Sequence, residues 1–112
     1  GPHADGLARA LASDTGVELA VVTLGGEGLM WQLRGQPAQR MPGFSVPHVM
    51  DTTGAGDTFH GALAFAWGLG QSPLDALRFA SAAAALKCTR PHGILGAPHQ
   101  DEVRAFLARS GT

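Results

Sequence analysis

The residues most able to do chemistry lie in one stretch, Asp51–Ala62, which reads DTTGAGDTFHGA. Two carboxylates, Asp51 and Asp57, flank a glycine-rich turn that runs into an apolar helical pattern. Such a turn points backbone N–H groups and the positive end of a helix dipole at one spot, which favours an anion such as phosphate. Beside that anion, Asp57 makes sense as a base that deprotonates an attacking hydroxyl. The stretch therefore predicts phosphoryl transfer.

A purely structural explanation of the same stretch exists. Gly-Ala-Gly before a helix can be a tight loop that allows close helix packing, with Asp57 capping the first turn. A bare three-residue pattern would favour that explanation. Here the pattern is longer, because Asp51 and Asp57 flank the five residues Thr-Thr-Gly-Ala-Gly. The added length favours the functional interpretation, since motif specificity rises with length and context.

A second glycine-rich segment, Thr23–Gly28, reads TLGGEG and follows an apolar run. A strand that ends in threonine and a glycine loop can bring backbone N–H groups against phosphates, with the hydroxyl as an extra contact. Alone this signal is weak, and a tight turn of the strand-to-helix type is the more common explanation of it. Its position some thirty residues before Asp51 gives it weight.

Together the two motifs resemble those of ribokinase-like (PfkB) carbohydrate kinases. The resemblance rests on Asp51–Phe59, followed by the small residues Gly61 and Ala62, and on the Thr-Leu-Gly-x-x-Gly pattern. It implies that Asp57 is the catalytic base. It also implies an anion hole and nucleotide contacts from backbone and small side chains, namely Gly54, Ala55 and Gly56 for the hole and Thr23, Gly25 and Gly28 for the nucleotide.

The same resemblance implies the cofactors. A monovalent cation such as K⁺ would lie next to the anion hole, bound by Asp51, by the carbonyl of Thr53 and by the loop Lys87–Gly96. Gly96 stands about where some family members place a serine ligand. An Asx-turn is the structural alternative for Asp51. ATP and Mg²⁺ are implied as well, although the family's acidic magnesium motif would lie before residue 1.

The part of the chain from Phe59 onward bears on which substrate branch of this family the chain resembles. Three segments are similar to sulfofructose kinases, which phosphorylate a ketohexose that carries a sulfonate at C6: Phe59–Ala64, Arg78–Ser81 and Ala85–Pro91. The similarity ends at His92–Leu95, where a Gly-Gly-Arg-Ala-like stretch is expected. Ser81 stands where many members carry Asn or His near the adenine. Lys87 and Arg90 read as loop cations exposed to solvent, or as partners for Asp51.

The hydrophobic pattern places these motifs in an alternation of helices and strands. The expected elements are a helix over 3–15, strands over 18–24, 29–33 and 38–41, an extended lead-in over 44–50, and helices over 56–67, 73–87 and 100–109. The run 18–24 is continuously apolar, which suits a strand buried on both faces of a parallel sheet. The small residues of 81–85 allow either close helix packing or a flat adenine ring alongside.

These elements predict the α/β class. With the resemblance, we expect part of a ribokinase-like three-layer αβα (Rossmann-like) sheet with helices on both faces. A doubly wound domain needs more βα units than this chain contains. Residues 1–112 are therefore expected to be the C-terminal nucleotide-binding and catalytic part of a kinase domain whose N-terminal part is absent.

Composition excludes several other classes. A net charge of −1 gives no basic footprint for nucleic acid and no charge run for an anionic membrane. No apolar stretch approaches the roughly 18 residues of a bilayer span. The five histidines lack metal-ligand spacing. The single cysteine, Cys88, excludes an internal disulfide, reads as a buried inert thiol and fits the cytoplasm.

The expected function is transfer of the γ-phosphate of ATP to a hydroxyl of a sugar or sugar derivative. Two alternatives stay open: a nucleoside or vitamin-alcohol kinase of the same fold, and a non-catalytic nucleotide-binding or oligomerisation fragment. Charged residues make up 15% of the chain, against about 25% in a typical protein. That low charge, with the alanine-rich helices, is compatible with a large interface such as that of a homodimer.

Overall fold

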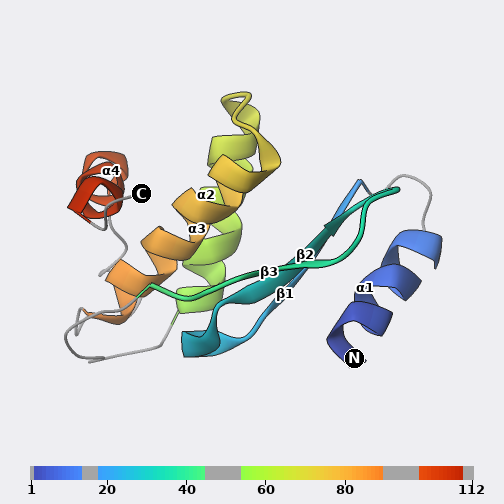
Figure 1. Cartoon of the computed structure of the whole chain (residues 1–112). Coiled ribbons are helices and arrows are strands. Elements are labelled where there is room, and N and C mark those ends of the chain that lie inside the picture. The colour runs from blue at the N-terminus through green and yellow to red at the C-terminus, as the bar shows by residue number, and fades with distance from the viewer. Residues whose placement is uncertain (1, 14–17, 45–53, 90–98, 110–112) are drawn as a thin grey trace. The chain divides into compact units, whose positions relative to one another are not determined.

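The computed structural model describes residues 2–13, 18–44, 54–89 and 99–109. The chain divides into two compact units, residues 1–43 and 44–112, and each is described by itself (Figure 1). Within the described ranges, no helix is both long and apolar enough to cross a membrane.

The first unit is one helix and a small sheet. Helix α1 (Pro2–Ser13) precedes strands β1 (Leu19–Thr23), β2 (Leu29–Leu33) and β3 (Gln39–Met41), with a single turn of 3₁₀-helix, η1 (Gly25–Glu27), between β1 and β2. The sheet is antiparallel in the order β1-β2-β3. The register pairs Val21 of β1 with Trp31 of β2.

The core of this unit forms because the helix and the sheet each bury one face. Leu7 and Leu11 lie one turn apart on α1 and are both buried, as the spacing of four residues requires. Alternate residues of β2, Leu29 and Trp31, are buried as well, which is the period of two of a strand with one covered face. The Arg34 guanidinium donates to the carbonyl of Leu11 at 2.7 Å and fastens the end of α1.

The strand expected over 18–24 is present as β1, but Leu19 to Val22 are half-buried rather than buried on both faces. Within the described residues β1 pairs with β2 alone, in antiparallel fashion. This pairing follows from the short connection to β2, because parallel neighbours need a crossover of a dozen or more residues. A parallel partner for β1 stays a prediction.

The described part of the second unit contains three helices, α2 (Ala55–Gly68), α3 (Pro73–Cys88) and α4 (Gln100–Arg109). Helices α2 and α3 lie side by side as a helical hairpin (Figure 1). The start of α3 confirms the prediction made from sequence: the Ser72 hydroxyl accepts a hydrogen bond from the Asp75 N–H at 3.2 Å, and Pro73 is the first helical residue. At α4, the His99 N–H donates to the Glu102 carboxylate at 3.0 Å.

Small side chains hold the three helices together. Ala66 of α2 and Ala82 and Ala83 of α3 are buried in a core with Phe79 and with Val103 of α4. Close helix packing, one of the two explanations for the small-residue run over 81–85, therefore applies to Ala82 and Ala83. Cys88, expected to be buried, is only half-buried because it is the last residue of α3. The expected lead-in over 45–50 and the loop residues 90–98 lie outside the described residues.

Candidate functional site

The glycine turn before α2 has the backbone geometry that an anion site needs. Gly54 is the N-cap of α2 and has φ 77° and ψ 4°, in the left-handed region that favours glycine. Its carbonyl accepts the first helical hydrogen bond, from the Thr58 N–H at 2.9 Å. The N–H groups of Ala55, Gly56 and Asp57 precede that bond, and a helix offers its first N–H groups no acceptor of its own. The turn can therefore present three donors to one anion.

Asp57 lies in the first turn of α2 and is exposed. It does not take the N-cap position, because Gly54 occupies it. Asp57 is therefore not the N-cap residue of α2, which was the simplest structural explanation of its presence. A carboxylate in the first turn is accessible to a ligand hydroxyl held in front of the donors of Ala55 and Gly56.

His60 is a neighbour of this turn that sequence reasoning missed. Its Nδ1 lies 2.8 Å from the carbonyl oxygen of Gly56. Because a carbonyl can only accept, Nδ1 carries the proton in this contact. The spacing of four residues after Gly56 was the available signal, since a residue at that distance on a helix lies directly above its partner.

The segment Thr23–Gly28 forms a tight turn. Leu24 donates to Gly28 at 2.8 Å and Gly28 donates back to the carbonyl of Gly25 at 3.1 Å. Gly25 and Gly28 have φ of 61° and 99°. A Cβ at Gly28 would overlap the backbone of Met41–Gly43, whereas Gly25 faces open space. Gly28 thus has a structural reason to be glycine, and Thr23 and Gly25 are exposed.

The residues predicted from sequence fall into three groups. Those of the anion hole and the base, Gly54, Ala55, Gly56 and Asp57, meet at the start of α2. The proposed nucleotide contacts Thr23, Gly25 and Gly28 lie in the first unit, and Ser81 lies on α3 in the second. Asp51 and Thr53, the proposed cation ligands, lie outside the described residues.

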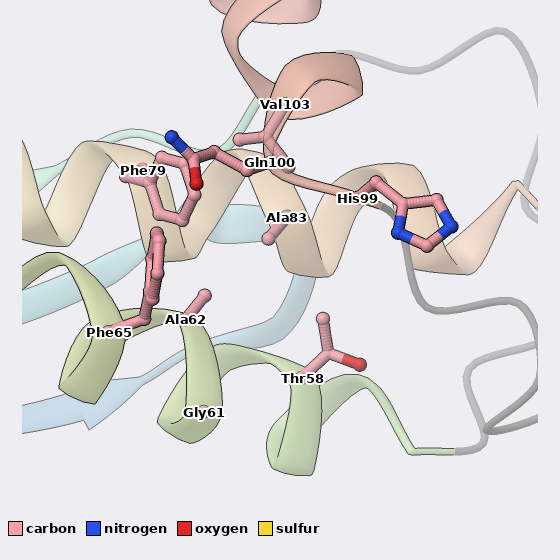
Figure 2. Close-up of a pocket in the computed structure, with 9 residues that line it drawn as sticks. All are labelled: Thr58, Gly61, Ala62, Phe65, Phe79, Ala83, His99, Gln100 and Val103. Carbon is pink, nitrogen blue, oxygen red and sulfur yellow. The ribbon is translucent and has the colours of Figure 1, made fainter.

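A pocket lies between α2, α3 and α4 (Figure 2). Its volume is about 390 Å³, within the range of small-molecule sites. Phe65 and Phe79 form its apolar end, with ring centroids 5.9 Å apart, and Thr58 and His99 lie toward the other end (Figure 2). The remaining lining residues are Gly61, Ala62, Ala83, Gln100 and Val103.

This pocket is distinct from the adenine position expected at Ser81. Phe79 and Ala83 line the pocket, and Ser81 is two residues from each of them on α3. Residues two apart lie on roughly opposite faces of a helix, so Ser81 faces away from the pocket. Sequence reasoning missed the pocket because its walls come from three separate helices, and the apolar spacing of each helix reads as ordinary core.

The described residues offer no group of three His, Cys, Asp or Glu side chains that could hold a metal ion. The magnesium and potassium ions expected from sequence are therefore not placed by the described side chains.

The family model for pfkB family carbohydrate kinases matches residues 1–100. The chain belongs to this family. It is 40% identical over 87 residues to the ribokinase of Lactococcus lactis subsp. lactis strain IL1403, an alignment that covers 78% of this chain and 28% of that protein. The chain thus spans about a third or less of the length of the curated relatives it matches.

Solved structures of pfkB relatives have the same arrangement. Arabidopsis thaliana ribokinase complexed with ribose and ATP superimposes with a TM-score of 0.79 at 34% identity, over 89% of this chain and 33% of that one. A putative ribokinase II from E. coli in complex with ATP and Mg²⁺ gives 0.80 at 31% identity, over 91% of this chain and 33% of that one. The predicted α/β class, as part of a ribokinase-like fold, is confirmed.

Proposed function

We propose that residues 1–112 are the C-terminal nucleotide-binding and catalytic part of an ATP-dependent sugar kinase. The observation that carries this proposal is the left-handed Gly54 cap, which turns the first N–H groups of α2 toward one point next to the exposed Asp57. Three donors for a phosphate beside one exposed carboxylate are what phosphoryl transfer to a hydroxyl needs.

The reaction follows from this arrangement. The Asp57 carboxylate accepts the proton of a sugar hydroxyl as the hydroxyl oxygen bonds to the γ-phosphorus of ATP. The bond from that phosphorus to the β–γ bridging oxygen breaks, and its electron pair leaves with ADP. The backbone N–H groups of Ala55, Gly56 and Asp57 hold the charge on the transferring oxygens.

We propose different residues as contacts of the nucleotide and as ligands of the cations. We assign nucleotide contacts to Thr23 and Gly25, whose exposure supports the assignment, and to Ser81 on α3. Gly28 has a structural role in the same turn, because its missing Cβ leaves room for the backbone of residues 41–43. Asp51 and the Thr53 carbonyl are proposed ligands of a monovalent cation such as K⁺. Among the described residues, no group of three His, Cys, Asp or Glu side chains could hold Mg²⁺.

A sugar is the acceptor we favour. Arabidopsis ribokinase, whose structure matches 89% of this chain, is complexed with ribose. No contact of the described residues favours a nucleoside or a vitamin alcohol. The sulfonate-bearing sugar, a homodimer and a cytoplasmic location stay predictions from sequence.

The test is an ATP titration of the 112-residue chain by calorimetry, with circular dichroism as the check on folding. Gly56→Val is the informative variant, because a Cβ at Gly56 meets no atom within 4 Å, so the added side chain projects into open space beside the turn. Gly68→Val, at the other end of α2 and equally open, is the matched control.

We expect saturable binding that Gly56→Val abolishes and Gly68→Val retains. A folded chain that binds no ATP would contradict the proposal. If the 112-residue chain is unfolded on its own, the same titration is made with the full-length kinase that carries it.

A further inference from the structure

Lys87 is a charged side chain in an unusual place. It lies in the last turn of α3 and is 0% exposed, and it is the only charged side chain buried among the described residues. Its Nζ has no hydrogen-bond partner there. The expectation that Lys87 is a solvated loop cation is therefore wrong. An ammonium buried without a partner costs several kcal/mol or more, so the position calls for an acceptor that the described residues do not contain.

The helical hairpin places Lys87 at the same end as the first residues of α2. From the connection between the helices, α2 runs back to Ala55 and α3 runs on to Lys87. At about 1.5 Å per residue, both residues lie on the order of 20 Å from that connection. Helices α2 and α3 pack against each other. Neighbouring helices lie about 8–10 Å apart and a lysine side chain is about 6 Å long, so the Gly54–Gly56 end of α2 is within the reach of a lysine at this position.

The described acids of the second unit do not supply the acceptor. Asp75 is in the first turn of α3, at the opposite end of that helix from Lys87. Asp101 and Glu102 are in the first turn of α4, and the Glu102 carboxylate accepts from the His99 N–H. The Asp57 carboxylate is not a hydrogen-bond partner of the Lys87 Nζ either.

We propose that Lys87 is a phosphate-binding residue whose ammonium contacts an oxygen of the phosphate held at the Gly54–Gly56 turn. This rests on the proposed function, which puts that phosphate at the same end of the hairpin. Backbone N–H groups supply partial positive charge, and a full positive charge beside them adds to the attraction of the phosphate. The cost of burying the ammonium is offset only when the phosphate arrives.

The test compares ATP with AMP, because only ATP carries the transferring phosphate. The full-length kinase that carries this chain is titrated with each nucleotide by calorimetry, and its thermal unfolding is recorded. Lys87→Met keeps the long apolar stem and removes the charge. Arg109→Met, which removes an exposed positive charge from the last turn of α4, is the matched control.

We expect Lys87→Met to weaken ATP binding by about tenfold or more, to leave AMP binding unchanged and to leave the melting temperature equal or higher. Arg109→Met should change neither nucleotide. Unchanged ATP affinity in Lys87→Met, with Gly56→Val still abolishing binding, would overturn this inference and leave the proposed function intact.

Two further outcomes would also overturn the inference. An unfolded or less stable Lys87→Met protein would show that the ammonium pairs with a group of the chain itself, such as Asp51, and would overturn the inference. Absence of ATP binding in the folded unsubstituted kinase would remove the proposed function first, and this inference with it.

Discussion

The imidazole of His60 bonds to the backbone carbonyl of Gly56, with 2.8 Å between Nδ1 and the oxygen. The contact ties a side chain of α2 to the glycine turn that we propose as the anion hole. Because His60 is exposed, the bond competes with water and contributes about 0.5–1.5 kcal/mol at most.

We therefore predict that His60→Ala lowers the free energy of unfolding by about 0.5–1.5 kcal/mol. ATP affinity should change little, since the turn donates through backbone N–H groups that the imidazole does not touch. Urea unfolding and calorimetry of the same preparation measure the two quantities. A large loss of ATP affinity at unchanged stability would instead make His60 a direct ligand contact.

Asp57→Asn tests the base. The amide keeps the size of the side chain but cannot accept a proton, so turnover in the full-length kinase should fall by about 10²–10⁴-fold or more. ATP binding should persist, because the donors are backbone groups. Asp75→Asn is the matched control: it removes an exposed carboxylate from the first turn of α3 and should leave turnover unchanged. Near-normal turnover in Asp57→Asn would discard the mechanism.

The helices of the candidate site were largely predictable from sequence. Ser72 and Pro73 define the start of α3 through local chemistry, a hydroxyl cap and a fixed φ, and the structure confirms both. The start of α2 follows in the same way from the glycines before Asp57. Such signals act within a few residues, so they can be recognised without knowledge of the rest of the fold.

Features that depend on distant neighbours were not predictable. A continuously apolar strand indicates burial but not the direction of its partner, and β1 proves antiparallel to β2. Lys87 reads as solvated because nothing local shows that packing against α3 will cover it. The pocket walls come from three helices, so Phe65 and His99 gave no joint signal.

Gly54→Ala and Gly56→Ala should have opposite effects on stability although both lie in the same turn. Gly54 has φ 77°, and an alanine there costs roughly 1–2 kcal/mol because its Cβ crowds the backbone. Gly56 lies inside α2 with open space at its Cβ, so alanine should stabilise by about 0.5–1 kcal/mol through helix propensity. Urea unfolding of both variants checks the sign. Equal effects would show that Gly54 does not need its left-handed conformation.

The glycines of the Thr23–Gly28 turn separate a structural role from a nucleotide contact. A Cβ at Gly28 would meet the Gly43 nitrogen at 2.6 Å and the Pro42 carbonyl carbon at 2.7 Å, and backbone atoms cannot give way cheaply. Gly28→Ala should therefore destabilise the first unit by well over about 1–2 kcal/mol, the cost of a strained φ alone. Gly25→Ala is strained in φ but meets nothing within 4 Å, so it should cost about 1–2 kcal/mol.

The same two variants bear on nucleotide binding. If Gly25 lets a phosphate or ribose approach the backbone, Gly25→Ala should weaken ATP binding by more than its modest effect on folding explains. Urea unfolding and ATP titration of Gly25→Ala and Gly28→Ala separate the two effects. Unchanged ATP affinity in a folded Gly25→Ala protein would leave the turn with the structural role that Gly28 already has, because its internal bonds and the close approach of residues 41–43 explain its glycines without a ligand.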